Sequence, residues 1–279
     1  MVPLILFNEV LGTDVNVPEK PLRIVCLSPA ITEILFMLGL GDRVIGVSAF
    51  CARPPEARNR RKFGSYNTVN IKALADVKPD LILAITGYQR ELAVKLSKIF
   101  PIYPLELPVS VAGIVDLVLK TGLVTGEHAK ARVVASSLIR NLDSLNSLVK
   151  NDPRVYVEID LGGPVSFGAF SYITDAISLI GAHNVFGEKR AEWISVDLDS
   201  IQREKLDVFI YEAKMYSDFD ESMLQKLLVK RQWNSLDFVK RGNYFLAPHR
   251  PLDFLAHHGP SFITEAMPWL AEKLRNVNM

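Results

Sequence analysis

Apolar and polar positions follow a helical period most clearly in the middle of the chain. Between residues 125 and 151, apolar residues recur at three- and four-residue steps with charged residues between them, which predicts one long amphipathic helix. Thr125 can cap its start, and Pro153 stops it because proline cannot continue a helix. At ~1.5 Å rise per residue the helix is roughly 36 Å long. The apolar stripe consists of Ala131, Val134, Leu138, Leu142, Leu145 and Val149.

The two halves on either side of this helix repeat one order of elements. Each begins with an apolar run of strand length, continues with a helix that ends at glycine, and returns through a short helix to a second apolar strand. Two such matches in the same order indicate an internal repeat. The matching segments are 23–27 with 154–158, 29–39 with 173–181, and 80–84 with 207–211.

Strands that alternate with helices across short connections predict parallel sheets covered by helices. The fold class is therefore α/β, with two similar lobes of mainly parallel sheet joined by a single long backbone helix and a ligand cleft between the lobes. The predicted boundaries are an N-terminal lobe over 1–124, a connecting helix over 125–151 and a C-terminal lobe over 152–279. Residues 4–18 add a predicted hairpin at the edge of the first lobe.

The composition limits the classes of partner. Of the 279 residues, 49% are hydrophobic and 23% are charged, and the formal net charge is +1. So small a charge gives no long-range attraction for a polyanion, and we expect no nucleic-acid partner. No apolar run approaches the ~18 residues of a transmembrane helix. Residues 1–7 are apolar but lack a basic start and a cleavage site, so they do not resemble a secretory signal.

No arrangement of residues indicates catalysis or a resident metal. The chain has no P-loop, no GxSxG motif and no paired carboxylates repeated on a helix face, which are patterns that carry known chemistries. Cys26 and Cys51 form no CxxC or disulfide framework. We therefore expect no catalytic residue, metal site or cofactor. His257 and His258 lack the spacing of a metal motif, and the alternative is that one of them ligates a metal held in a bound chelate.

Aromatic residues lie in the loops that follow predicted strands. Ligands of open α/β sheets lie beyond the carboxyl ends of the strands, so these residues are candidates for the walls of a binding site. For Phe50 and Tyr66 the alternative is that they hold their loop against their own lobe. The candidates on this argument are Phe50, Tyr66, Tyr88, Phe170 and Trp193.

Several stretches together resemble one known family, the solute-binding proteins of ABC importers for cobalamin, ferric siderophores and haem. In that family two lobes are joined by one long helix. No single motif is diagnostic, but the set covers nearly the whole chain in order. The stretches are 22–35 (LRIVCLSPAITEIL), 46–48 with 54–57, 78–82 (KPDLI), and 233–236 with 242–246.

The resemblance is strongest to the cobalamin-binding branch and implies a corrinoid or similar metal chelate as ligand. It places Phe50, Tyr66 and Trp193 at aromatic positions of the ligand cleft. Aromatic faces suit a flat, largely apolar macrocycle. Ile85 stands where relatives carry a tryptophan, and no arginine cluster typical of siderophore recognition is present. The full expected ligand-binding set is Pro29, Phe50, Tyr66, Tyr88, Phe170, Trp193, Phe254, His257 and His258.

The resemblance also implies a partner, the permease of an ABC importer, and two positions that contact it. Relatives carry an acidic residue on each lobe that pairs with arginines of the permease. The matching positions here are Lys72 and Asp199, so one of the two carries the opposite charge.

Three further expectations complete the interpretation. The resemblance implies a monomer outside the cytoplasm, periplasmic or membrane-anchored, with a cytoplasmic location as the alternative because no signal peptide is visible. The alternative functions are a cytoplasmic enzyme of tetrapyrrole or metal metabolism, such as a chelatase, and a binder of ferric siderophores or haem.

Overall fold

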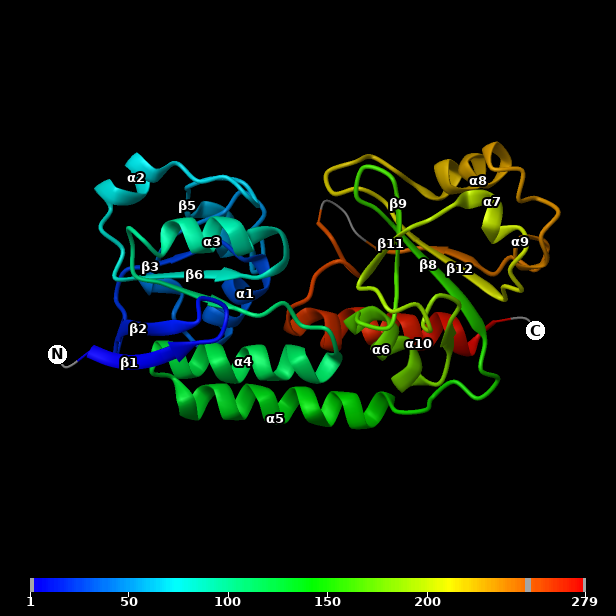
Figure 1. The fold of residues 1–279 in the computed structure, drawn as a ribbon. Coiled ribbons are helices and arrows are strands. Elements are labelled where there is room, and N and C mark those ends of the chain that lie inside the picture. Colours follow the sequence, from blue (N-terminus) through cyan, green and yellow to red (C-terminus); the bar gives the residue numbers. More distant parts are fainter. Residues whose placement is uncertain (1–2, 249–251, 278–279) are drawn as a thin grey trace. The chain divides into compact units, whose positions relative to one another are not determined.

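The computed structural model describes residues 3–248 and 252–277. The chain divides into two units: unit 1 runs to Pro108 and includes Ala112–Ile139, and unit 2 includes Val109–Val111 and continues from Arg140. Each unit has its own sheet flanked by helices (Figure 1). The predicted fold class, two α/β lobes with mainly parallel sheets, is confirmed.

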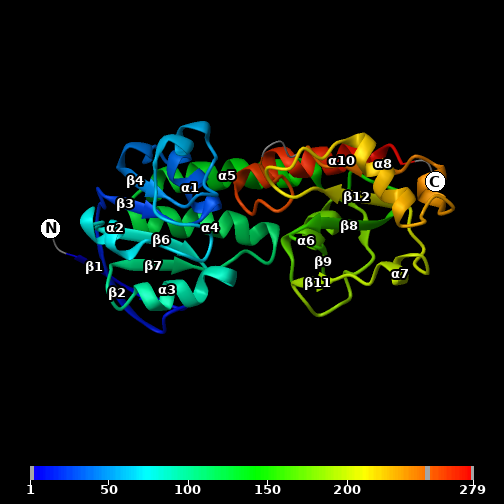
Figure 2. The ribbon, with the colours of Figure 1, turned by 90° about the horizontal axis from the view of Figure 1, so that it is seen from above.

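The sheet of unit 1 is parallel throughout and has the strand order β5-β4-β3-β6-β7. Its central strands are buried along their whole length, as expected for a parallel sheet covered on both faces. Figure 2 shows β6 and β7 of this sheet beside α3. The strands are β3 (Ile24–Cys26), β4 (Val44–Val47), β5 (Arg61–Lys62), β6 (Leu81–Ile85) and β7 (Ile102–Leu105).

The first helix of unit 1 begins where the sequence offers a cap. Ser28 accepts a hydrogen bond from the N–H of Ile31 at 3.4 Å, and Pro29 occupies the first turn of α1, where a missing N–H costs nothing. The predicted N-terminal hairpin is formed by β1 (Pro3–Asn8) and β2 (Thr13–Pro18). The helices are α1 (Pro29–Met37), α2 (Ile71–Asp76) and α3 (Arg90–Leu96), with 3-10 turns η1 (Gly41–Arg43), η2 (Pro55–Asn59) and η3 (Gly87–Gln89).

Two consecutive helices, α4 (Val111–Thr125) and α5 (His128–Leu145), occupy the middle of the chain. The helix predicted over 125–151 corresponds to α5, which is shorter at both ends. Thr125 is the last residue of α4 and donates its hydroxyl to the carbonyl of Thr121 at 2.7 Å, so its predicted role as an N-cap is wrong. Gly126 separates the helices with a φ of +75°, a conformation that favours glycine. The division between the two units falls within α5.

The sheet of unit 2 has the order β11-β9-β8-β12-β13, and β10 also pairs with β8. Strands β8, β10, β12 and β13 run parallel, whereas β9 is antiparallel to both of its neighbours. The sheet is therefore mixed at one edge. The strands are β8 (Arg154–Asp160), β9 (Pro164–Phe167), β10 (His183–Asn184), β11 (Trp193–Ser195), β12 (Val208–Glu212) and β13 (Tyr244–Leu246).

Helices cover both faces of this sheet: α7, α8 and α9 lie on one face, and α6 and α10 lie on the other (Figure 1). An aromatic core lies under α8 and α9, where Tyr156 stacks on Phe209 at 5.3 Å and Trp233 meets Phe209 edge-on at 5.5 Å. The helices are α6 (Tyr172–Ile180), α7 (Leu198–Ile201), α8 (Glu221–Lys230), α9 (Asp237–Lys240), the π-helical turn η4 (Phe262–Ala266) and α10 (Met267–Arg275).

Among the residues that the structure describes, no helix has both the length and the apolar character that crossing a bilayer requires.

Candidate functional site

The segment between β4 and α2 brings together two of the predicted aromatic residues of unit 1. Phe50 and Tyr66 pack edge to face, with ring centroids 5.9 Å apart and planes at 73°. Both side chains are half-buried, so each supports the other and still presents surface to solvent. Pro29 lies at the start of α1, directly after the carboxyl end of β3, and is buried.

A short hairpin carries Tyr66, and a glycine makes it possible. Gly64 forms an antiparallel bridge with Val69, and the Ser65 N–H donates to the carbonyl of Thr68 at 3.0 Å. A Cβ on Gly64 would lie 1.8 Å from that Thr68 oxygen, far inside van der Waals contact. The position of Tyr66 therefore depends on the absence of a side chain at residue 64.

Gly64→Ala is expected to lower the free energy of unfolding by about 1–3 kcal/mol, the range for overpacking at a rigid site, and to separate Tyr66 from Phe50. Urea unfolding measures the first effect. Gly163→Ala is the control, because a Cβ at Gly163 meets no atom within 4 Å. Equal midpoints for the two variants would show that the hairpin tolerates a methyl group.

Gln89 anchors the same hairpin to the sheet of unit 1 and was not predicted. Its side chain is fully buried. Its amide nitrogen donates to the carbonyls of Leu27 at 2.8 Å and Tyr66 at 2.9 Å, and its oxygen accepts from the N–H of Ile85 at 3.0 Å. One side chain thus joins the ends of β3 and β6 to the loop that carries Tyr66. The side chain of the neighbouring Tyr88, a predicted ligand residue, lies outside the described part of the structure.

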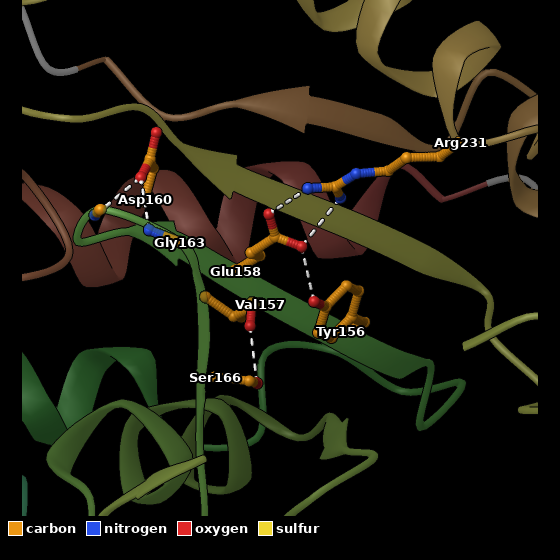
Figure 3. Close-up of polar contacts among 8 residues, drawn as sticks. Tyr156, Val157, Glu158, Asp160, Gly163, Ser166 and Arg231 are labelled. Atoms are coloured by element: carbon orange, nitrogen blue, oxygen red, sulfur yellow. Dashed lines mark hydrogen bonds and ion pairs between the residues drawn. The ribbon is translucent and has the colours of Figure 1, made fainter. Parts of the chain in front are cut away.

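In unit 2, a tight turn between β8 and β9 begins the arrangement that positions Trp193. Asp160 accepts hydrogen bonds from the N–H groups of Gly162 at 2.9 Å and Gly163 at 3.1 Å (Figure 3). The Ser166 hydroxyl then donates to the carbonyl of Val157 at 2.7 Å. These bonds fix β9 against β8, and β9 in turn pairs with the strand that starts at Trp193.

The segments on either side of Trp193 and Phe170 are joined through backbone hydrogen bonds. Gly168 donates to the carbonyl of Glu192 at 3.3 Å, and Phe170 donates to the carbonyl of Ala191 at 3.1 Å. Phe170 is 52% exposed, and Trp193 is half-buried. Burial raises the pKa of Glu192. The structure therefore holds these two predicted aromatic residues on adjoining, cross-linked segments with accessible surface.

The loop after β13 carries the remaining predicted ligand residues. Phe254 is half-buried and meets the ring of Trp269 edge-on at 5.8 Å. In contrast, His257 and His258 are buried, with 1% and 7% exposure. Nδ1 of His257 lies 4.0 Å from a carboxylate oxygen of Asp253. The histidines thus lie in the interior of unit 2, and no three His, Cys, Asp or Glu side chains in residues 3–248 and 252–277 gather as a metal site.

A buried ion pair stabilises the face of β8 that α8 covers. Arg231 donates to both oxygens of Glu158, at 2.8 and 2.6 Å, and the Tyr156 hydroxyl donates to Glu158 at 2.6 Å (Figure 3). The side chain of Glu158 is 1% exposed and that of Arg231 is 10% exposed. Burial and the nearby carboxylate raise the pKa of Tyr156. This cluster is closed to solvent, so we assign it to the fold of unit 2.

The predicted docking residues occupy equivalent places in their units. Lys72 lies in the first turn of α2, which Asn70 caps, and Asp199 lies in the first turn of α7, which Asp197 caps. Both side chains are exposed. The macrodipole of a helix favours an anion at this end, so Asp199 is stabilising there and Lys72 is not.

Comparison with known proteins identifies the family. The family described as periplasmic binding protein matches residues 24–251. The chain belongs to this family. Among its relatives, an uncharacterised ABC transporter substrate-binding lipoprotein, YvrC of Bacillus subtilis, is 24% identical over 97% of this chain and 85% of its own length.

Other relatives differ in the ligand that their names give. A vitamin B12-binding protein of Yersinia pestis is 25% identical over 67% of this chain and 68% of its own length. The periplasmic haem-binding protein RhuT of Roseiflexus sp. RS-1 has the same fold, with a TM-score of 0.75 and 18% identity over 91% of this chain and 98% of its own.

Family membership confirms several predictions made from the sequence. This periplasmic binding protein is a solute-binding protein of the type that serves ABC importers, and the enzyme alternative is excluded because the family consists of binding proteins. Such a protein has two partners, a small-molecule ligand and a permease. The cobalamin, siderophore and haem type is confirmed as a group, whereas the individual ligand remains a prediction.

Proposed function

We propose that this protein captures a corrinoid, or a closely related metal chelate, outside the cytoplasm and delivers it to an ABC importer. The observation that carries the proposal is a group of accessible aromatic side chains in each unit, three of them in loops and one at the start of β11. Phe50 and Tyr66 form such a group in unit 1, and Phe170 and Trp193 form one in unit 2. The relative that binds vitamin B12 supports the choice of ligand.

The chemistry of these groups fits a large, flat and mostly apolar ligand. Aromatic rings bury a large area at a low cost in side-chain entropy and bind through faces and edges. The backbone hydrogen bonds around Tyr66 and Trp193 hold both rings in place before the ligand arrives, which reduces the entropy that binding costs.

Haem and ferric siderophores are the competing ligands. A haem held through its iron needs an accessible axial ligand, commonly histidine. His257 and His258 are buried in unit 2, which supports recognition through the rings of the site over direct ligation by these histidines. The shared fold of the haem-binding neighbour does not separate the two ligands, since its identity to this chain is only 18%.

Docking to the permease belongs to the same proposal. Lys72 and Asp199 are exposed at equivalent helix starts. In the proposed complex Asp199 pairs with a permease arginine through charge-assisted hydrogen bonds. Lys72 repels such an arginine, so we propose that the matching socket of the cognate permease is altered.

The ligand proposal predicts a measurable role for Trp193. Trp193→Ala is expected to weaken corrinoid binding at least about fivefold, which corresponds to the ~1 kcal/mol of a lost aromatic contact. Cyanocobalamin or cobinamide should also quench the tryptophan fluorescence of the wild-type protein. Titration of both proteins followed by fluorescence or absorbance checks the expectation.

The control is Phe7→Ala, which removes an aromatic ring that is 55% exposed on β1, a strand with no predicted ligand residue. It should leave corrinoid affinity unchanged. The role assigned to Trp193 is wrong if the two variants bind cobinamide equally well.

A further inference from the structure

Glu212, the last residue of β12, holds the loop over residues 253–258 through its side chain. Oε1 accepts hydrogen bonds from the N–H groups of Phe254 at 3.1 Å and Ala256 at 3.4 Å, and Oε2 accepts one from Leu255. The side chain is 1% exposed. Three consecutive backbone N–H groups thus converge on one buried carboxyl group of the protein.

A second side chain holds the same loop from α6. The hydroxyl of Tyr172 donates to the carbonyl of Leu255 at 2.8 Å. The ring of Tyr172 meets Phe262 edge-on at 4.8 Å and His258 at 6.3 Å. Leu255 is therefore bonded on its N–H side to Glu212 and on its carbonyl side to Tyr172.

Unit 1 uses an equivalent device with different chemistry. Gln89 is fully buried and donates to the carbonyl of Tyr66, in the loop that carries the aromatic pair. Each unit thus fixes a loop that carries a proposed ligand residue with one buried polar side chain. The difference is that an amide does not titrate, whereas a carboxyl group does.

We propose that Glu212 is the positioning residue for ligand binding in unit 2: its carboxyl group fixes the 253–258 loop and thereby Phe254. The inference rests on the proposed function, because the loop carries residues of the proposed site. It deepens that function by adding a residue that touches the loop backbone and not the ligand. The loop opens when these hydrogen bonds break, and the exposed carboxyl group then meets water.

The charged surroundings of Glu212 give this coupling a pH dependence. Burial and the neighbouring Asp253 raise the pKa of Glu212 to about 7, against the lowering effect of the three N–H groups. His257 lies beside Asp253 at 4.0 Å, Tyr172 faces the loop from α6, and Ile159 of β8 is the uncharged neighbour on the sheet.

The direction of the pH dependence follows from the difference in proton binding between the closed and the open loop. An exposed glutamate has a pKa of ~4.3, so between that value and about 7 the closed loop keeps a proton that the open loop releases. Closure is therefore most favourable at acidic pH and weakens as the pH rises to about 7. Between pH 5 and pH 8 the opening constant should increase by about a hundredfold, at one factor of ten per pKa unit.

Hydrogen exchange of the ligand-free protein, followed by mass spectrometry across pH 5–8, tests the inference in wild type, Glu212→Gln and Glu204→Gln. Glu204 is the control because it lies in the same unit and is exposed. After correction for intrinsic exchange, the 253–258 peptide of the wild type and the control should lose protection about a hundredfold with rising pH. Glu212→Gln should exchange faster at pH 5 and show no such trend, while the peptide of β8 stays protected.

Cyanocobalamin titration of the same proteins completes the experiment. The inference predicts at least tenfold weaker binding by Glu212→Gln at pH 5. It is overturned if the loop peptide of Glu212→Gln exchanges as in the wild type, or if exchange rises with no loss of affinity. If the wild type binds no corrinoid while the exchange results are as expected, the anchoring of the loop stands and the proposed ligand falls.

A second variant keeps the test decisive if Glu212→Gln does not fold. Asp253→Asn keeps Glu212 and removes the like charge beside it. The pH midpoint of loop exchange should then move to a lower value. An unchanged midpoint would contradict the role of Glu212 in the loop.

Discussion

Arg231→Met is expected to lower the free energy of unfolding by about 3–5 kcal/mol, because it leaves the buried carboxylate of Glu158 without its cation. The two side chains are 10% and 1% exposed, and the guanidinium donates to both carboxylate oxygens. Methionine keeps an unbranched apolar side chain at this position but has neither the positive charge nor the N–H donors of arginine. Urea unfolding of the wild type and the variant measures the difference.

Two further proteins separate the loss of the charge pair from a loss of packing. Glu158→Gln combined with Arg231→Met removes both charges and keeps an acceptor for Tyr156, so it should recover at least half of the lost stability. Arg203→Met is the surface control: its nitrogen lies 4.0 Å from Asp197, both side chains are exposed, and the cost should stay below about 1 kcal/mol. Arg231→Met behaving like Arg203→Met would contradict the assignment.

Lys72→Glu is expected to strengthen binding to a conventional importer by at least about tenfold. The change removes a repulsion from a permease arginine and adds a charge-assisted bond worth ~1.5–3 kcal/mol. It should not harm the fold, because glutamate in the first turn of α2 suits the helix macrodipole and the side chain is exposed. Pull-down assays with a permease that carries an arginine at this socket measure the effect, and the permease from the same genome is tested beside it.

A matched control distinguishes this local charge from the change in net charge. Lys95→Glu alters the net charge by the same amount at another exposed position of unit 1, on α3. It should bind the permease as the wild type does, and Asp199→Ala should bind more weakly. The charge-pair argument is wrong if the wild type docks normally and none of the three changes matters.

Elements with a strong apolar period were predictable from the sequence. The strands at 23–27 and 154–158 and the helix before Gly181 are present as β3, β8 and α6, because buried parallel strands and amphipathic helices leave a clear pattern in the order of residues. Gly181 adopts a φ of +94° at the end of α6, as a glycine after a helical stripe indicates.

The boundaries of the middle helices were harder to predict. The start of α5 depends on Gly126, which has a left-handed φ. The residue also lies against the carbonyl of Glu19, where an added Cβ would be 2.4 Å from the oxygen. That carbonyl is far away in sequence, so local pattern alone indicated Thr125. Helix α4 was missed for a related reason, since Gly122 interrupts its pattern and is needed where Ala131 packs.

Some residues of the candidate site could also be predicted from the sequence, and others could not. Phe50 and Tyr66 could be proposed because they follow β4, where ligands of α/β sheets lie. Trp193 was predicted to lie in a loop, and the structure instead places it at the start of β11.

Gln89 and Glu212 could not be predicted, since each acts on backbone groups more than 20 positions away in sequence. Their one local signal is a polar residue at or just after an apolar strand, which is also the ordinary end of a strand. His257 and His258 were proposed from their type, and the structure places both in the interior.

Calorimetric titration of the wild-type protein with cyanocobalamin, cobinamide, haemin and a ferric hydroxamate tests the central claim most directly. The account predicts one-to-one binding of a corrinoid with a Kd at or below about 1 µM, which corresponds to ~8 kcal/mol, and weaker binding of the two iron chelates. No detectable heat with either corrinoid, together with tight binding of haemin or the hydroxamate, would contradict it.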